Sequence, residues 1–216
     1  MSEDIRAKMQ RLQEGWGRRA SDEGKANVDA LLEHVKVTGH EHEGQRRAIG
    51  TAHRQQAERR VNEAYRFQQD ALDWFMGEIQ TGGYTRWQGY FAASLLVVNL
   101  RQGCTEGTAA FDQAAGGAQI FFDQSHRVEH GAVPESWKAP DPSDVDVQRG
   151  AQFAQNLLEW FGNAVAMDGI GRWQGYFAAA LLTIELRMSC PDAEGGVQLF
   201  DAAADAAWAY YDAATG

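Results

Sequence analysis

One octapeptide, RWQGYFAA, occurs twice in this chain, at residues 86–93 and at residues 172–179. The copies are 86 positions apart, and the same register aligns 34 pairs without a gap from Ala71/Leu157 to Cys104/Cys190. Seventeen of the 34 pairs are identical, which chance does not produce. Beyond the cysteines the second copy gains three residues. The chain therefore contains a duplicated structural unit, which covers roughly 61–127 and 147–216.

Each copy predicts three helices. Apolar residues recur close to every 3.6 positions in the first segment of each copy, as they do on one face of a helix. The turns TGGYT and DGIG end these helices, because glycine adopts the positive φ that reverses the chain. The second helix of each copy is apolar around most of its circumference and is therefore expected at the core. The expected helices are 61–79, 87–101 and 108–124 in the first copy and 153–165, 173–187 and 197–213 in the second.

We expect an all-α fold in which the two three-helix copies form one pseudo-two-fold helical bundle, with an N-terminal helical arm packed outside. A copy of about 65 residues has too many bulky apolar groups to bury alone, which favours one joint domain over two similar domains joined by a linker. Only 14 residues separate Arg86 from Arg101, whereas a bilayer span needs about 20. The expected segments are an amphipathic arm and turn at 1–44, a long helix and the first copy at 45–127, a proline-rich linker at 128–146 and the second copy at 147–216, with 45–216 as the joint domain.

Small residues recur on one face of each central helix. Gly89 and Ala93 are four positions apart, as are Gly175 and Ala179, and small side chains let two helix backbones approach closely. A glycine within a helix costs about 1 kcal/mol relative to alanine, so a close contact must offset that cost. We expect the two central helices to cross at these four residues; ordinary packing against a bulky neighbour is the alternative.

An arginine and two aromatic residues recur at the start of each central helix. Guanidinium and indole N–H groups at such a position can bind an anionic or aromatic group, so a ligand pocket between the copies is one hypothesis. The alternative is core packing of the rings, with the arginines bonded to turn carbonyls or paired with repeated acids. The pocket candidates are Arg86, Trp87, Tyr90, Arg172, Trp173 and Tyr176, and the repeated acids are Asp112, Asp123, Asp201 and Asp212.

Histidines and cysteines give little indication of a metal centre. The spacings that suit metal ligands are His40 with His42 and His126 with His130, which predict at most the capture of zinc or nickel at the surface. No glutamate is followed three positions later by histidine, so the di-iron site of a helical bundle is rejected. Cys104 and Cys190 are expected as buried thiols, with a disulfide between them as the alternative. No cofactor is expected.

Charge is distributed unevenly along the chain. Residues 1–66 hold 13 basic and 11 acidic groups, a net charge of +2, whereas residues 67–216 hold 7 and 19, a net charge of −12. An acidic body repels phosphate, which argues against nucleic-acid binding by the whole chain and leaves a local stripe of arginines as the alternative. That stripe comprises Arg46, Arg47, Arg54, Arg59, Arg60 and Arg66.

The N-terminal arm carries an apolar stripe that a completed bundle does not need. Ile5, Met9, Leu12 and Trp16 alternate at spacings of four and three, as in a coiled coil. The chain has no nucleophile motif, phosphate loop or dinucleotide fingerprint. The sequence therefore predicts a non-enzymatic structural or scaffolding subunit that self-associates, as a homo-oligomer or polymer, through this stripe. The alternatives are an arm folded back on its own bundle, a small-ligand binder or enzyme with a pocket between the copies, and a nucleic-acid-associated protein.

The expected location of the protein is cytoplasmic or intravirion, without integral membrane association. The first residues, MSEDIRAKMQRLQEG, are too polar to contain the apolar core of a signal peptide. Two cysteines are also too few for the disulfide framework of a small secreted protein.

Overall fold

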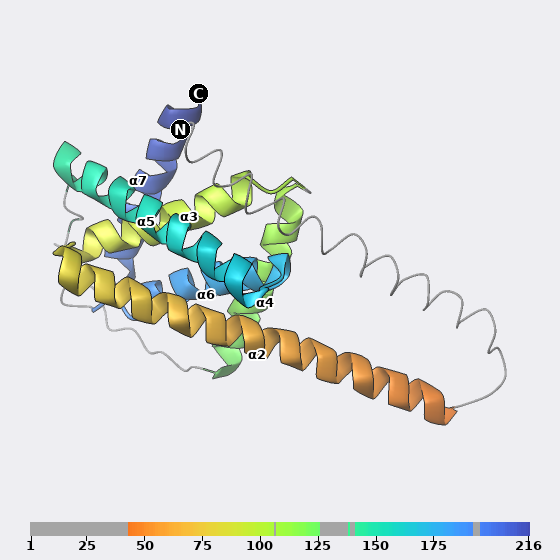
Figure 1. The fold of residues 1–216 in the computed structure, drawn as a ribbon. Coiled ribbons are helices and arrows are strands. Elements are labelled where there is room, and N and C mark those ends of the chain that lie inside the picture. The colour runs from red at the N-terminus through yellow and green to blue at the C-terminus, as the bar shows by residue number, and fades with distance from the viewer. Residues whose placement is uncertain (1–42, 106, 126–137, 139–140, 192–194) are drawn as a thin grey trace.

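The structure is a computed structural model that describes residues 43–105, 107–125, 138, 141–191 and 195–216, with side chains from residue 53 onward. Within these residues the chain forms α-helices and no strand, so the all-α prediction is confirmed. The helices pack as a bundle (Figure 1). They are α2 (Glu43–Gly82), α3 (Arg86–Gln102), α4 (Thr108–Ser125), α5 (Asp144–Asp168), α6 (Arg172–Met188) and α7 (Val197–Thr215).

The turns that end the first helix of each copy have the backbone that the sequence predicted. Gly83 has φ 62° and Gly169, which lies 86 positions later, has φ 67°. Thr85 then caps α3, because its side-chain oxygen accepts a hydrogen bond from the backbone N–H of Gln88. The Gln88 side chain accepts one from the backbone of Thr85 in return, and Gln174 makes the same return contact at the start of α6. Each central helix consequently starts at the arginine of RWQGYFAA.

Each central helix packs mainly against the flanking helices of the other copy. α3 lies against α5 and α7, and α6 lies against α2 and α4, while helices that follow each other in the chain make few contacts. α3 and α6 also contact each other. The buried residues of the two copies consequently belong to one hydrophobic core.

Ring contacts between the copies occur in matched pairs. The matched residues are 86 positions apart or, after the three-residue insertion, 89 positions apart. These rings join α3 to α7 in the same way as they join α6 to α4. The pairs are Tyr90–Phe200 and Tyr176–Phe111, each with 5.3 Å between ring centroids, and Phe91–Tyr210 and Phe177–Phe121, each with 5.8 Å.

The N-terminal half of α2 extends away from the rest of the bundle (Figure 1). A helix of 40 residues is about 60 Å long at 1.5 Å per residue. Its residues 53–60 are all exposed, and the first buried side chain described on it is that of Ala64. The predicted arm, including Ile5, Met9, Leu12 and Trp16, lies outside the described residues. None of the described helices has the length and the hydropathy that a membrane span requires.

Candidate functional site

The four aromatic residues considered for a ligand pocket pack against other rings. Trp87 and Trp173 each lie against the phenylalanine four positions later, with 5.3 and 5.0 Å between ring centroids. Tyr90 and Tyr176 are 5% and 1% exposed and contact α7 and α4, respectively. None of these four residues lines the cavity that lies between α2 and α5.

Two of the repeated acids pair with arginines at the C-terminal ends of the central helices. Nε of Arg101 donates to Oδ1 of Asp112 at 2.7 Å, and Nε of Arg187 donates to Oδ1 of Asp201 at 2.7 Å. The Arg101 guanidinium holds the pKa of Asp112 below its ordinary value through this hydrogen bond. Pairing with the arginines at the start of the helices was one alternative for these acids, and Asp112 and Asp201 instead pair with the arginines at the C-terminal ends. At those starts, Arg86 is exposed and Arg172 is half-buried.

The small residues of the central helices lie in the core. Gly89 faces α2, because a Cβ built on it would be 2.8 Å from Cδ1 of Ile79 and 3.1 Å from Cζ of Phe75. Glycine at this position therefore makes room for two bulky side chains of α2. The other three predicted crossing residues, Ala93, Gly175 and Ala179, are buried.

The histidines considered for metal capture, His40, His42, His126 and His130, lie outside the described residues. In the part of the chain that the structure describes, no three His, Cys, Asp or Glu side chains gather as a metal ion would require. Cys104 and Cys190 are both buried and both free.

Five aromatic rings form a row along the contact between α2 and α5, which we call the aromatic ladder. The rings are, in order, Phe67, Trp160, Trp74, Phe153 and Tyr84. Successive ring centroids are 6.0, 5.4, 6.1 and 4.5 Å apart, and three of the four steps are stacked. Seven positions separate the phenylalanine from the tryptophan on each helix, so two helical turns place both rings on one face. Four of the five rings, all except Tyr84, form two matched pairs in the register of the repeat.

One end of the ladder is closed by the chain's own residues. Tyr84, in the turn between α2 and α3, stacks on Phe153 with an interplanar angle of 12°. The guanidinium carbon of Arg149 is 5.2 Å from the centroid of the Tyr84 ring. Nη2 of Arg149 also donates to the carbonyl oxygens of Gly82 and Gly83, at 3.0 Å each. A stacked ring and a cation over that ring therefore complete this end.

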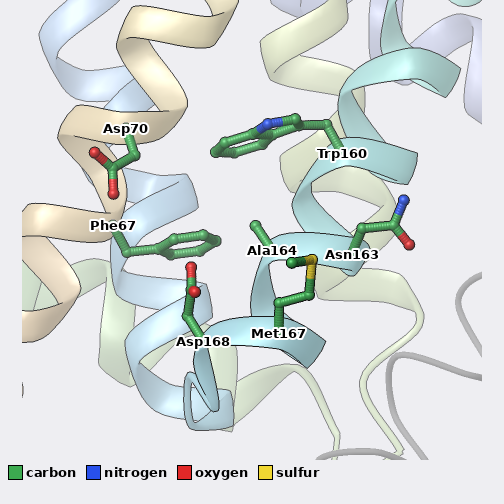
Figure 2. A pocket seen from close by; sticks show the side chains of 7 residues that line it. All are labelled: Phe67, Asp70, Trp160, Asn163, Ala164, Met167 and Asp168. Carbon is green, nitrogen blue, oxygen red and sulfur yellow. The ribbon is translucent and has the colours of Figure 1, made fainter.

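A cavity of about 310 Å³ lies at the other end of the ladder, beside Phe67 and Trp160. Phe67 and Asp70 reach it from α2, and the other lining residues come from the C-terminal part of α5 (Figure 2). In this view the Asp168 carboxylate points towards the Phe67 ring. The lining residues are Phe67, Asp70, Trp160, Asn163, Ala164, Met167 and Asp168.

The lining combines aromatic faces with negative charge. Phe67 is 2% exposed and Trp160 is half-buried, so both rings are held in place by the core. The carboxylates of Asp70 and Asp168 are exposed and have no hydrogen-bond or ion-pair partner among the described residues. Met167 is 85% exposed at the rim, and its flexible thioether can adapt to a neighbouring group. This arrangement supports binding by stacking and by charge.

Sequence reasoning missed this cavity, because its residues form no motif and Asp70 and Asp168 are far apart in the chain. The sequence signal that could have indicated this site was a set of residues that differ between the two copies, rather than residues that are identical in both. Tyr84 and Arg149, which close one end of the ladder, correspond in the register of the repeat to Ile170 and Glu63.

Comparisons with protein-family models, curated proteins and solved structures found no match to this chain.

Proposed function

We propose that this chain is a non-enzymatic structural subunit that self-associates through its N-terminal region. The observation that carries the proposal is the N-terminal half of α2, which extends from the bundle and is exposed over residues 53–60 (Figure 1). Helices in proteins owe most of their stability to tertiary packing, so a helix that leaves its own core favours a partner. The apolar stripe of Ile5, Met9, Leu12 and Trp16 precedes this helix in the sequence and provides a surface that a second copy would bury.

We further infer that the two copies arose by duplication and are related by a pseudo-two-fold axis. The matched ring pairs and the matched Arg–Asp pairs support this inference. Trp74 also stacks on its own counterpart, Trp160, with 5.4 Å between ring centroids, as residues close to such an axis do. A core that both copies complete for each other leaves the N-terminal region as the connector to other chains.

The distribution of charge favours contact between the N-terminal region of one chain and the body of another. Residues 43–66 hold six arginines and three glutamates, a net charge of +3, whereas residues 67–216 have a net charge of −12. Opposite charges accelerate association, and salt weakens the effect. Two free, buried cysteines suit a reducing compartment, so we place the protein in the cytoplasm or inside a virion.

Multi-angle light scattering on the full chain tests self-association. We expect a mass above the 23.9 kDa of one chain at micromolar concentrations. Leu12→Asp combined with Trp16→Asp should produce a monomer, because the two substitutions place charge in the apolar stripe. A full-length chain that stays monomeric across the micromolar range would overturn the proposal.

A matched control places the same added charge on the other face of the arm. Ala7→Asp combined with Gln10→Asp should leave the mass of the assembly unchanged.

Duplex DNA added to the full chain tests the nucleic-acid alternative, since Arg54 and Arg60 are exposed on α2. A salt-sensitive increase in mass with DNA, lost in Arg54→Ser with Arg60→Ser, would favour that alternative over self-association.

A further inference from the structure

The two ends of the aromatic ladder occupy equivalent positions of the repeat but are completed differently. Four of the five rings match in pairs, since Phe67 corresponds to Phe153 and Trp74 corresponds to Trp160. At the Phe153 end, the ring of Tyr84 continues the stack at 4.5 Å. At the Phe67 end, the residue that corresponds to Tyr84 is Ile170, which packs against the core, and the cavity of about 310 Å³ lies beside Phe67 and Trp160. The open end therefore lacks the ring that continues the stack at the filled end.

The closed end contains a ring and a positive charge. The Tyr84 ring contacts two groups: its centroid is 4.5 Å from that of Phe153 and 5.2 Å from the guanidinium carbon of Arg149. The guanidinium also bonds two carbonyl oxygens of the adjacent turn, which fixes it over the ring. Stacking and the cation over the ring therefore act together at this end.

Two substitutions between the two ends remove the ring and the positive charge from the open end. The Tyr84 position is Ile170, and the Arg149 position is Glu63. The cavity also carries two carboxylates where the closed end has an uncharged residue. These are Asp70, which corresponds to Asn156, and Asp168, which corresponds to Gly82. The lining also loses one acid, because Ala164 corresponds to Glu78. The open end consequently keeps the aromatic platform, lacks the Arg149 cation and carries one more carboxylate in its lining than the corresponding positions of the closed end.

We propose that the open end of the ladder is a binding site for a planar aromatic ring that carries a positive charge. The ring stacks beside Phe67 and Trp160, and the positive group lies between the carboxylates of Asp70 and Asp168. A cavity of about 310 Å³ is at the lower limit of small-molecule sites and suits one ring system. Met167 at the rim covers the outer face of the bound ring.

This chemistry has two available sources. One is a free small molecule, and the other is the N-terminal arm, in which Trp16 is followed closely by Arg18 and Arg19. The inference concerns the cavity of a single chain and does not depend on self-association. Its measurement is therefore ligand binding, whereas self-association is measured by mass.

Three probes that share the 5-fluoroindole ring separate charge from stacking. They are 5-fluorotryptamine, which is cationic, 5-fluoroindole, which is neutral, and 5-fluoroindole-3-acetate, which is anionic. Ligand-observed ¹⁹F NMR titrations on the full chain give the affinity of each probe whatever the mass of the protein. We expect the cation to bind most tightly and the anion most weakly, with about 10-fold between them for two exposed carboxylates.

Variants then locate the site. Asp70→Asn combined with Asp168→Asn should lower the affinity for 5-fluorotryptamine to that for 5-fluoroindole. The control, Asp205→Asn combined with Asp212→Asn, removes the same charge from exposed positions on α7 and should leave the affinity for 5-fluorotryptamine unchanged. Ala164→Met fills the cavity from a half-buried helical position and should abolish binding of all three probes. Equal affinity for the three probes, an equal effect of both double variants, or unchanged binding in Ala164→Met would overturn the proposal.

The source is decided with Trp16→Ala in the full chain. Tighter binding of 5-fluorotryptamine to this variant than to the unchanged chain would support the proposal with the arm as the occupant, because the arm then no longer competes. Equal binding to the two proteins would support it with a free small molecule as the occupant.

Discussion

Some residues of this core are packed so closely that one added methyl group should change the stability of the fold. Gly150 on α5 faces Phe91 on α3, and a Cβ built on Gly150 would be 2.7 Å from Cδ1 and 3.2 Å from Cγ of that ring. The Phe91 ring is fully buried, so it has no free space into which it can move. Glycine at position 150 therefore sets how closely α5 approaches the central helix.

The same substitution at two helical glycines should consequently have opposite effects. Gly150→Ala should lower the free energy of unfolding by about 1–3 kcal/mol, because the methyl group overpacks the core against Phe91. Gly116→Ala on α4 should raise it by about 0.5–1 kcal/mol, since nothing lies within 4 Å of the new Cβ and alanine favours the helix. Urea unfolding followed by circular dichroism measures both values. Effects of the same sign would contradict this account of the packing.

At the scale of the element, the start of α5 is tied to the central helix as well as to its own cap. Ser143 and Asp146 form a capping box, in which Oγ of Ser143 donates to Oδ2 of Asp146 at 2.6 Å. Nε2 of Gln88, on α3, donates to the other carboxylate oxygen at 2.9 Å. The hydrogen bonds from Ser143 and then from Gln88 hold the pKa of Asp146 below its ordinary value. One carboxylate thus both starts a helix and joins two elements.

Asp146→Asn should lower the free energy of unfolding at pH 7 by about 1 kcal/mol, the usual value of a helix cap. A carboxyl group whose pKa is lowered on folding stabilises the protein fully above its unfolded pKa of about 3.9 and loses that effect as the pH falls through the folded pKa. The difference between the two proteins should therefore shrink as the pH falls below the unfolded pKa and through the lowered folded pKa. Urea unfolding at several pH values measures it. Asp144→Asn is the matched control, and an equal pH dependence for both variants would show that charge at the helix start suffices.

The repeat made the helices of this fold predictable but not their partners. The glycine turns at Gly83 and Gly169 and the arginines that start the central helices were readable from the sequence. The sequence does not show that each central helix packs against the other copy. Both α2, from the same copy as α3, and α5, from the other copy, present apolar faces that suit α3. The aromatic ladder was not predictable either, because aromatic residues at helical spacing fit an ordinary core equally well and the sequence does not show which rings of the two copies meet.

At the scale of the whole molecule, each copy depends on the other for its core. α3 lies mainly against α5 and α7, which belong to the second copy, and α6 lies mainly against α2 and α4, which belong to the first. A three-helix copy without its counterpart would expose the apolar circumference of its central helix to water. Burial of the core therefore requires that the two copies associate, and the covalent link between them contributes less to it.

Separate copies should therefore fold only together. Fragments 1–140 and 141–216 should each show much less helicity at 222 nm than their share of the full chain, and an equimolar mixture should regain it, because each supplies the flanking helices that the other lacks. As a control, a protease site placed in the linker and cut after folding should leave the spectrum unchanged. Native helicity and cooperative unfolding of fragment 141–216 alone would mean that the second copy carries its own core, and the contacts between copies would then be docking between two domains.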